Sequence, residues 1–243
     1  MMAALEQQRR SRVLVLHGMH SSTAAFLPEA QALCASLHDL VECDGPPHDG
    51  MWWWPSVDHV RPDPRGALGW EMSYAELEPL LDAYDAVFGF SQGAAMAAVL
   101  CALHPTRVRF GIFACGFTAV GTGIPSLVEG DEALGAIDVP SFHIIGERDG
   151  AVPPEASQHL ASRFKDPTVV TTSAGHWIQK NGDVLGALRA FLESLPAKLR
   201  LDEARGGPAR RGKKKPRAKA PRSSARPRPR PAEGLPSPPP APL

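Results

Sequence analysis

Ala86-Val87-Phe88-Gly89-Phe90-Ser91-Gln92-Gly93 joins an apolar run to the small-residue stretch Ala94-Ala95-Met96-Ala97-Ala98-Val99-Leu100. The apolar run predicts a buried strand and the second stretch predicts a helix, which places Gly-Phe-Ser-Gln-Gly on a tight turn between them. A GxSxG motif in this setting predicts a nucleophile elbow, where small neighbours let strand and helix approach and the serine hydroxyl is presented above the sheet. The alternative is a glycine-rich turn whose serine only caps the helix.

Apolar runs of strand length alternate with helical patterns along the rest of the chain. The predicted strands are residues 12–16, 41–43, 86–90, 108–114, 141–145 and 168–172, and the predicted helices are residues 24–37, 74–84, 94–104, 154–164 and 184–195. Residues 44–50, rich in proline and glycine, are expected to be irregular. This alternation predicts the α/β class, with a doubly wound, mostly parallel sheet covered by helices on both faces.

Length and charge divide the chain into one folded domain and two ends. The 243 residues, 43% of them hydrophobic, suffice for a single α/β domain, which we place at residues 12–198 after a flexible N-terminus at 1–11. Residues 1–200 hold 14 Lys and Arg against 23 Asp and Glu, a net charge of −9, whereas residues 201–243 hold 12 against 3 and carry +9. An acidic folded domain argues against nucleic acid as its substrate.

The C-terminal segment, residues 199–243, is predicted to be disordered. From residue 201 on it holds 11 of the 25 prolines and the basic run Arg210-Arg211-Gly212-Lys213-Lys214-Lys215-Pro216-Arg217, without aromatic residues to build a core. Such a tail fits a nuclear-localisation patch, a contact with a polyanion, a membrane surface or a protein partner, or a solvated extension without an essential role. A competing hypothesis makes the α/β domain a non-catalytic scaffold for this tail.

Targeting and cysteine patterns favour an intracellular protein. Residues 1–12 are polar and basic without a following apolar signal core, and no stretch approaches the roughly 20 apolar residues of a membrane span. The four cysteines lack CxxC spacing and are interpreted as buried free thiols: Cys34, Cys43, Cys101 and Cys115. We expect a cytoplasmic location, with the nucleus as an alternative through the basic tail.

Candidate catalytic residues follow the predicted strands, where the ligand-binding edge of a parallel sheet lies. Ser91 needs a base to accept its proton, and the base needs a carboxylate to orient it. The order Ser91, Asp149, His176 is that of α/β-hydrolases. Among the rival residues, His104 ends a helix, His143 lies inside a strand, and Asp138 precedes its strand. The alternatives are an exposed loop histidine at position 176 and, at position 149, a turn aspartate that caps its own backbone.

Acyl transfer also needs N–H donors directed at the developing oxyanion. The expected donors are the backbone amides of Gln92, which follows the nucleophile, and Met19, in the loop after the first strand. His17 and His20 of that loop could be read as metal ligands, but two histidines three apart without a third ligand are more often structural. We predict no metal and no cofactor, since the mechanism needs only water.

The tryptophans at positions 52–54 are interpreted either as the lining of an acyl pocket or as core under a long loop. An apolar pocket would favour fatty-acyl or aromatic-acyl esters over charged ones. Candidate substrate-pocket residues are His17, Trp52, Trp53, Trp54, Val152 and Trp177.

Taken together, these motifs resemble the FSH1-type serine hydrolases over about residues 10–195. The resemblance rests on Leu16-His17-Gly18 with Phe26, Asp44-Gly45-Pro46 with His48, the tryptophans after it, the GxSxG stretch, Gly146-Glu147-Arg148-Asp149 with Val152-Pro153, and Gly175-His176. It implies an esterase or thioesterase that cleaves small-molecule acyl esters through a triad of Ser91, Asp149 and His176. Two positions depart from the family pattern. Ala174 stands where a second glycine is usual, and Trp177-Ile178-Gln179 stands where one residue and then a proline often follow the histidine. Both departures concern substrate shape more than chemistry.

The acyl-protein thioesterases are a competing resemblance through Gly-Phe-Ser-Gln-Gly, and they imply a depalmitoylase. The Asp-Gly-Pro segment and the Gly-Glu-Arg-Asp turn favour the FSH1 type. Both families imply attack by Ser91, proton transfer through His176 and deacylation by water.

Overall fold

The computed structural model describes residues 10–37, 41–50, 52, 70–119 and 136–195. Residues 1–9 of the predicted N-terminal segment, the predicted tail, Trp53 and Trp54 lie outside these residues, whereas Ser11, predicted to precede the domain, begins its first strand. Within them, six strands form one sheet in which each neighbouring pair is parallel, in the order β3-β1-β5-β6-β7-β8. These strands are β1 (Ser11–Leu16), β3 (Val41–Asp44), β5 (Ala86–Phe90), β6 (Gly111–Ala114), β7 (Ser141–Gly146) and β8 (Thr168–Thr172).

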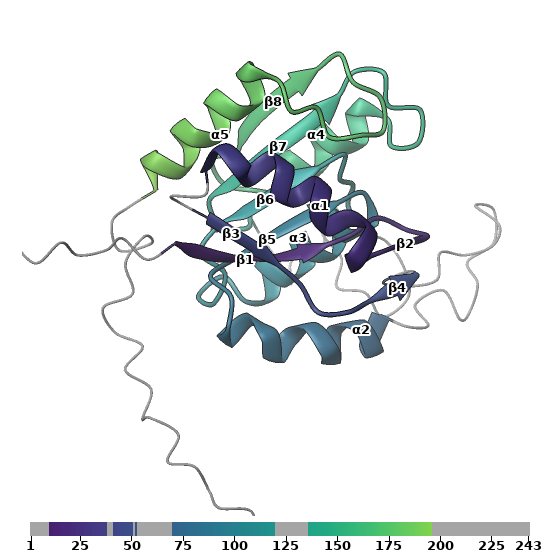
Figure 1. Cartoon of the computed structure of the whole chain (residues 1–243), viewed down its shortest axis with the longest axis vertical. Helices are drawn as coiled ribbons and strands as arrows, with labels where there is room; N and C mark the ends of the chain where they lie inside the picture. The colour runs from purple at the N-terminus through teal and green to yellow at the C-terminus, as the bar shows by residue number, and fades with distance from the viewer. Residues whose placement is uncertain (1–9, 38–40, 51, 53–69, 120–135, 196–243) are drawn as a thin grey trace, which may run out of the picture. The chain divides into compact units, whose positions relative to one another are not determined.

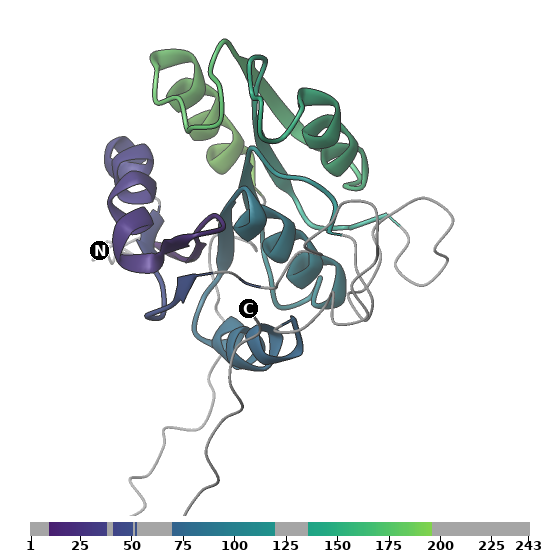
Figure 2. The ribbon, with the colours of Figure 1, turned by 90° about the vertical axis from the view of Figure 1, so that its right-hand side faces the viewer.

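Helices cover both faces of this sheet, as Figure 1 and the turned view in Figure 2 show. Residues of α1 (Thr23–Cys34) and α5 (Gly182–Ser194) pack in one core cluster, and residues of α2 (Trp70–Leu77), α3 (Gln92–Leu103) and α4 (Pro154–Ser162) pack in the other. Alternate residues of β1 supply the two clusters, Leu14 and Leu16 on one side and Val13 and Val15 on the other. The predicted doubly wound α/β fold is therefore confirmed.

The central helix α3 is apolar on every side because it is enclosed. Its first ten residues are all buried, from Gln92 to Cys101, and the sequence there is rich in alanine. Small side chains let this helix lie close to β5 and β6, and Pro105, two residues beyond its last residue, cannot continue it. This rigid packing fixes the start of α3, where the serine of the elbow lies.

Several element boundaries differ from those that the sequence predicts. Helix α2 begins at Trp70, four residues earlier than predicted, and gives way to a 3-10 turn, η2 (Glu78–Asp82), where Pro79 cannot donate a helical hydrogen bond. The strand predicted from residue 108 begins at Gly111. The segment predicted as irregular contains the short strand β4 (Asp49–Gly50), which pairs antiparallel with β2 (Ser21–Ser22). This pairing involves only two residues on each side, and on the β4 side both lie after the prolines, so the prolines do not prevent it. A second 3-10 turn, η1 (Ala35–Leu37), follows α1.

In the part of the chain that the structure describes, no helix combines the length and apolar character that a membrane span requires. All four cysteines lie in this part, and each is buried without a disulfide, as the sequence predicts.

Candidate active site

The GxSxG stretch forms the sharp turn between β5 and α3. Ser91 has φ 54° and ψ −120°, a backbone conformation that residues other than glycine rarely adopt. Its N–H donates to the Ala114 carbonyl of the neighbouring strand at 2.9 Å, which holds the turn against the sheet. Although Ser91 is the N-cap of α3, its side chain makes no capping hydrogen bond. The hydroxyl is thus directed away from the helix, unlike in the helix-cap alternative.

Two glycines of the motif are required by close packing. A Cβ atom on Gly89 would overlap the backbone of Gly93 and Ala94, and one on Gly93 would overlap the carbonyl oxygens of Leu16 and His17. The first contact brings strand and helix together across the turn, and the second brings the start of α3 against the end of β1. Glycine is therefore the residue type that this elbow permits at both positions.

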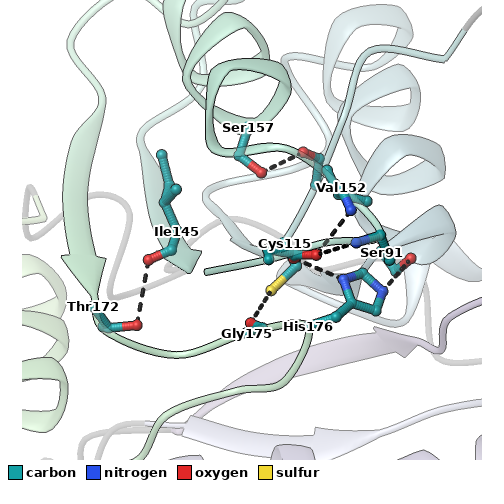
Figure 3. Close-up of polar contacts among 11 residues, drawn as sticks. Ser91, Cys115, Ile145, Val152, Ser157, Thr172, Gly175 and His176 are labelled. Atoms are coloured by element: carbon teal, nitrogen blue, oxygen red, sulfur yellow. Dashed lines mark hydrogen bonds and ion pairs between the residues drawn. The ribbon is translucent and has the colours of Figure 1, made fainter. Parts of the chain in front are cut away.

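His176 joins the Ser91 hydroxyl to the Asp149 carboxylate. Its Nε2 lies 3.1 Å from Ser91 Oγ and its Nδ1 lies 2.7 Å from Asp149 Oδ2, and Figure 3 shows the imidazole pointing toward the serine. An ionised carboxylate only accepts, so Nδ1 carries the proton and Nε2 is free to accept from the hydroxyl. The arrangement can deprotonate Ser91 as an incoming carbonyl carbon is attacked.

Asp149 divides its two oxygens between loop and histidine. Oδ1 accepts from the backbone N–H groups of Ala151 at 2.9 Å and Val152 at 2.8 Å, which leaves Oδ2 for His176. Burial alone would raise the pKa of Asp149, but these hydrogen bonds, with the one from Val152 foremost, hold it below its ordinary value. The aspartate therefore does cap its own loop, as one alternative expected, and it also orients the histidine.

The loop carrying His176 is fixed from both sides. The Trp177 N–H donates to the Gly175 carbonyl at 2.9 Å, which turns the chain tightly at His176, and Arg148 N–H holds the Ala174 carbonyl at 3.0 Å. The Trp177 indole packs over Gly175, where a Cβ atom would overlap the ring, yet 57% of Trp177 is exposed. The Phe90 ring lies 4.9 Å from the His176 ring. His176 is thus a positioned side chain and not a freely exposed loop histidine.

Cys115 is a neighbour of these groups that the sequence reasoning missed. It follows β6 with φ 50°, is buried, and its Sγ lies 3.9 Å from the Gly175 carbonyl (Figure 3). The Cys115 sulfur, an Asp149 carboxylate oxygen and a His176 ring nitrogen all lie within 4.8 Å of one another. Burial, together with the Asp149 charge, raises the pKa of the Cys115 thiol, so it stays protonated. Its place directly after a strand, like that of the other site residues, was the available signal.

The loop after β1 lies against the nucleophile. A Cβ atom on Gly18 would be 3.4 Å from Ser91 Cβ, and Met19, the next residue, is 43% exposed. Gln92 opens α3 directly after Ser91 and is buried. The two segments predicted to supply oxyanion donors therefore both adjoin Ser91.

The remaining pocket candidates lie mostly in the interior. His17 is fully buried and Trp52 is 1% exposed, so the core alternative describes this tryptophan. Both ring nitrogens of His17 have partners, Nδ1 the Gly18 carbonyl at 2.7 Å and Nε2 His48 Nδ1 at 2.8 Å, which leaves neither for a metal shared with His20. Val152 is buried beside Asp149. Trp177 is the pocket candidate that reaches solvent.

Comparison with known proteins yields a family model, "Serine hydrolase (FSH1)", that matches residues 45–185. Esterase OVCA2 of Mus musculus is 31% identical over 200 residues, which cover 76% of this chain and 83% of that protein. Esterase OVCA2 of Bos taurus is 28% identical over 220 residues, covering 75% and 95%. A solved carboxylesterase from Mesorhizobium loti superposes with a TM-score of 0.53 at 19% identity, covering 77% of this chain and 90% of that one, a likeness of fold. The chain belongs to the FSH1 serine hydrolase family and is an esterase of the α/β-hydrolase type.

Proposed function

We propose that Ser91, His176 and Asp149 are the catalytic triad of this esterase and that catalysis passes through an acyl-enzyme. The observation that carries the proposal is the unbroken chain of hydrogen bonds from Ser91 Oγ through His176 to Asp149. Ser91 Oγ attacks the ester carbonyl carbon while His176 Nε2 takes the hydroxyl proton, and the Asp149 carboxylate stabilises the imidazolium. As the tetrahedral intermediate collapses, His176 returns that proton to the departing alcohol, and Ser91 keeps the acyl group.

Deacylation repeats these steps with water in place of Ser91. His176 Nε2 takes a proton from the water that attacks the acyl carbonyl, and returns it to Ser91 Oγ as the carboxylic acid leaves. The backbone N–H groups of Gln92 and Met19 are the proposed donors to the oxyanion in both halves. The positive end of the α3 dipole, next to Ser91, would add to their effect.

The proposed substrate is a small-molecule carboxylic ester with an apolar acyl group. The two relatives are named esterases. Two exposed apolar side chains also adjoin residues of the site in sequence: Met19 follows Gly18, and Trp177 follows His176. A thioester could undergo the same attack, and comparison of an oxygen ester with its thioester analogue measures that preference directly.

Labelling with a fluorophosphonate probe tests the proposal. Wild-type protein should label, Ser91→Ala should not, and His176→Ala should lose labelling rate and p-nitrophenyl ester hydrolysis by about 10⁴-fold or more. Ser157→Ala is the matched control, because this buried serine instead donates to the Gly116 carbonyl at 2.7 Å, and it should label like wild type. Labelling that persists in Ser91→Ala would refute the proposed triad. A folded wild-type protein that never labels would instead favour the hypothesis that the α/β domain is a non-catalytic scaffold.

A further inference from the structure

Trp52 makes three hydrogen bonds from a segment far in sequence from the elbow. Its indole N–H donates to the His17 carbonyl at 2.7 Å, its backbone N–H donates to Gln92 Oε1 at 3.0 Å, and its carbonyl accepts from Ser73 Oγ at 2.7 Å. Trp52 is 1% exposed, and Gln92 and His17 are equally enclosed. Hydrogen bonds at such depth are costly to lose, because a buried polar group without a partner keeps its full desolvation penalty.

Two of these bonds end on the two segments proposed to hold the oxyanion. Gln92 bears one proposed donor on its own backbone, and the His17 carbonyl lies two residues before Met19, which bears the other. The segments also touch directly, because the His17 carbonyl oxygen lies where a Cβ atom of Gly93 would be. Trp52 therefore bonds to both segments of the proposed oxyanion site: its indole to the loop after β1, and its backbone N–H to the first residue of α3.

A pair of histidines holds the indole itself in place. The His48 ring stacks on it, with centroids 3.8 Å apart and planes inclined by 9°, and the His17 ring lies 4.8 Å away. The Gly18 carbonyl can only accept, so His17 Nδ1 donates to it and His17 Nε2 accepts from His48 Nδ1. Burial lowers the pKa of both imidazoles, and the nearby His17 lowers the pKa of His48 further.

We infer that Trp52 is a positioning residue for catalysis, which clamps the loop after β1 and the start of α3 so that the Met19 and Gln92 amides converge. This inference rests on the proposed function, because it assigns a role at the same oxyanion site. Trp52 touches neither the Ser91 hydroxyl nor the triad hydrogen bonds in the contacts above. Its loss should therefore displace the oxyanion donors while Ser91, His176 and Asp149 stay in register.

Replacing Trp52 with phenylalanine removes the indole N–H and keeps an aromatic ring against His48. Loss of one oxyanion donor costs about 10²–10³-fold in kcat, and displacement of a donor should cost less, about 10–100-fold, with KM changed by less than about threefold. A trifluoromethyl ketone forms a tetrahedral adduct whose oxyanion occupies the same site. Its inhibition constant should rise by the same factor as kcat falls, and the pH profile of kcat/KM should keep its wild-type midpoint.

The experiment counts active sites by phosphonate titration, so that kcat is expressed per competent serine. Trp70→Phe is the matched control, because Trp70 is 4% exposed and stacks on Tyr74 instead of bridging the elbow, and its kcat per site should stay within about twofold of wild type. A Trp52→Phe enzyme with kcat per site and ketone affinity within threefold of wild type would overturn the inference.

A second variant decides the matter if Trp52→Phe does not fold. Ser73→Ala removes the hydrogen bond to the Trp52 carbonyl and should lower kcat at least threefold with unchanged KM, whereas unchanged kcat would overturn the inference. Ser91→Ala separates the two proposals. If Ser91→Ala remains active, the proposed triad fails; if Ser91→Ala is inactive and Trp52→Phe behaves as wild type, only the role of Trp52 fails.

Discussion

His143 should make the folded protein lose stability as the pH falls from 7 to 5. This histidine lies inside β7, 2% exposed, with its ring stacked on Phe113 at 4.8 Å and edge-on to Phe164 at 5.1 Å. No residue in the described part of the chain offers its buried Nε2 a hydrogen-bond partner. Burial lowers its pKa to about 3, because the charged imidazolium would have to sit among apolar rings.

The direction follows from proton binding in the two states. The unfolded chain protonates this imidazole below its ordinary pKa of about 6.5, while the folded protein keeps it neutral until about pH 3, so acid favours the unfolded chain. From these two pKa values, the loss between pH 7 and pH 5 is about 2 kcal/mol. In a protein of this size that corresponds to a fall in melting temperature of about 4–8 °C.

Urea unfolding of wild type and His143→Phe at both pH values measures this contribution. The variant should lose about 2 kcal/mol less than wild type between pH 7 and pH 5, whatever its stability at pH 7. Phe164→Leu is the control, because it disturbs the same ring cluster without removing a titrating group, and it should keep the wild-type difference. If the His143→Phe difference stays within about 0.5 kcal/mol of wild type, the assigned pKa and this reasoning are wrong.

Two further predictions concern the site and its support. Gly93→Ala should destabilise the protein by about 3 kcal/mol or more in urea unfolding, because the added Cβ atom would overlap the Leu16 carbonyl. Gly182→Ala is the control: its Cβ atom would meet open space, so this variant should be neutral or stabilise the protein by up to about 1 kcal/mol. Equal effects of the two substitutions would contradict the packing argument. Asp149 has a lowered pKa in the fold, so its ionised form stabilises the protein above about pH 4, the ordinary aspartate value, and this stabilisation is lost as the pH falls through the lowered pKa. The stability difference between wild type and Asp149→Asn should accordingly narrow between pH 6 and pH 3, and a constant difference would be the opposing result.

The fold was predictable because local patterns and the global topology agree. Most of the six strands are short apolar or β-branched runs, and every crossover except the one between β6 and β7 contains a predicted helix, so the parallel sheet follows from the order of the elements. The boundaries were less predictable where tertiary contacts decide them. The pairing of Asp49–Gly50 with Ser21–Ser22 joins segments nearly thirty residues apart, and neither segment carries a strand pattern by itself.

The candidate triad was predictable for a related reason, since parallel strands bring their carboxyl ends to one edge and each triad residue follows a strand. The sequence could not predict the contacts that loops from different parts of the chain make with one another. The place of Cys115 directly after a strand indicates the edge of the sheet on which it lies but not that its thiol meets Asp149, and nothing around Trp52 indicates that its indole reaches His17. The sequence leaves Trp52 as either pocket or core, and only the three-dimensional contacts distinguish the two.

The conformation of Ser91 explains why closely packed, buried neighbours adjoin the candidate nucleophile. A non-glycine residue at φ 54° costs about 1–3 kcal/mol, and that cost must be offset by neighbours that cannot relax. The Ser91 N–H is held by Ala114 of β6, and the Ser91 carbonyl accepts from Ala94 and Ala95 in the first turn of α3. Because the first ten residues of α3 are buried, releasing the serine would require the central helix to leave the sheet. The alanine-rich helix therefore does more than fill the core: its packing energy maintains the strained turn on which the proposed attack by Ser91 depends.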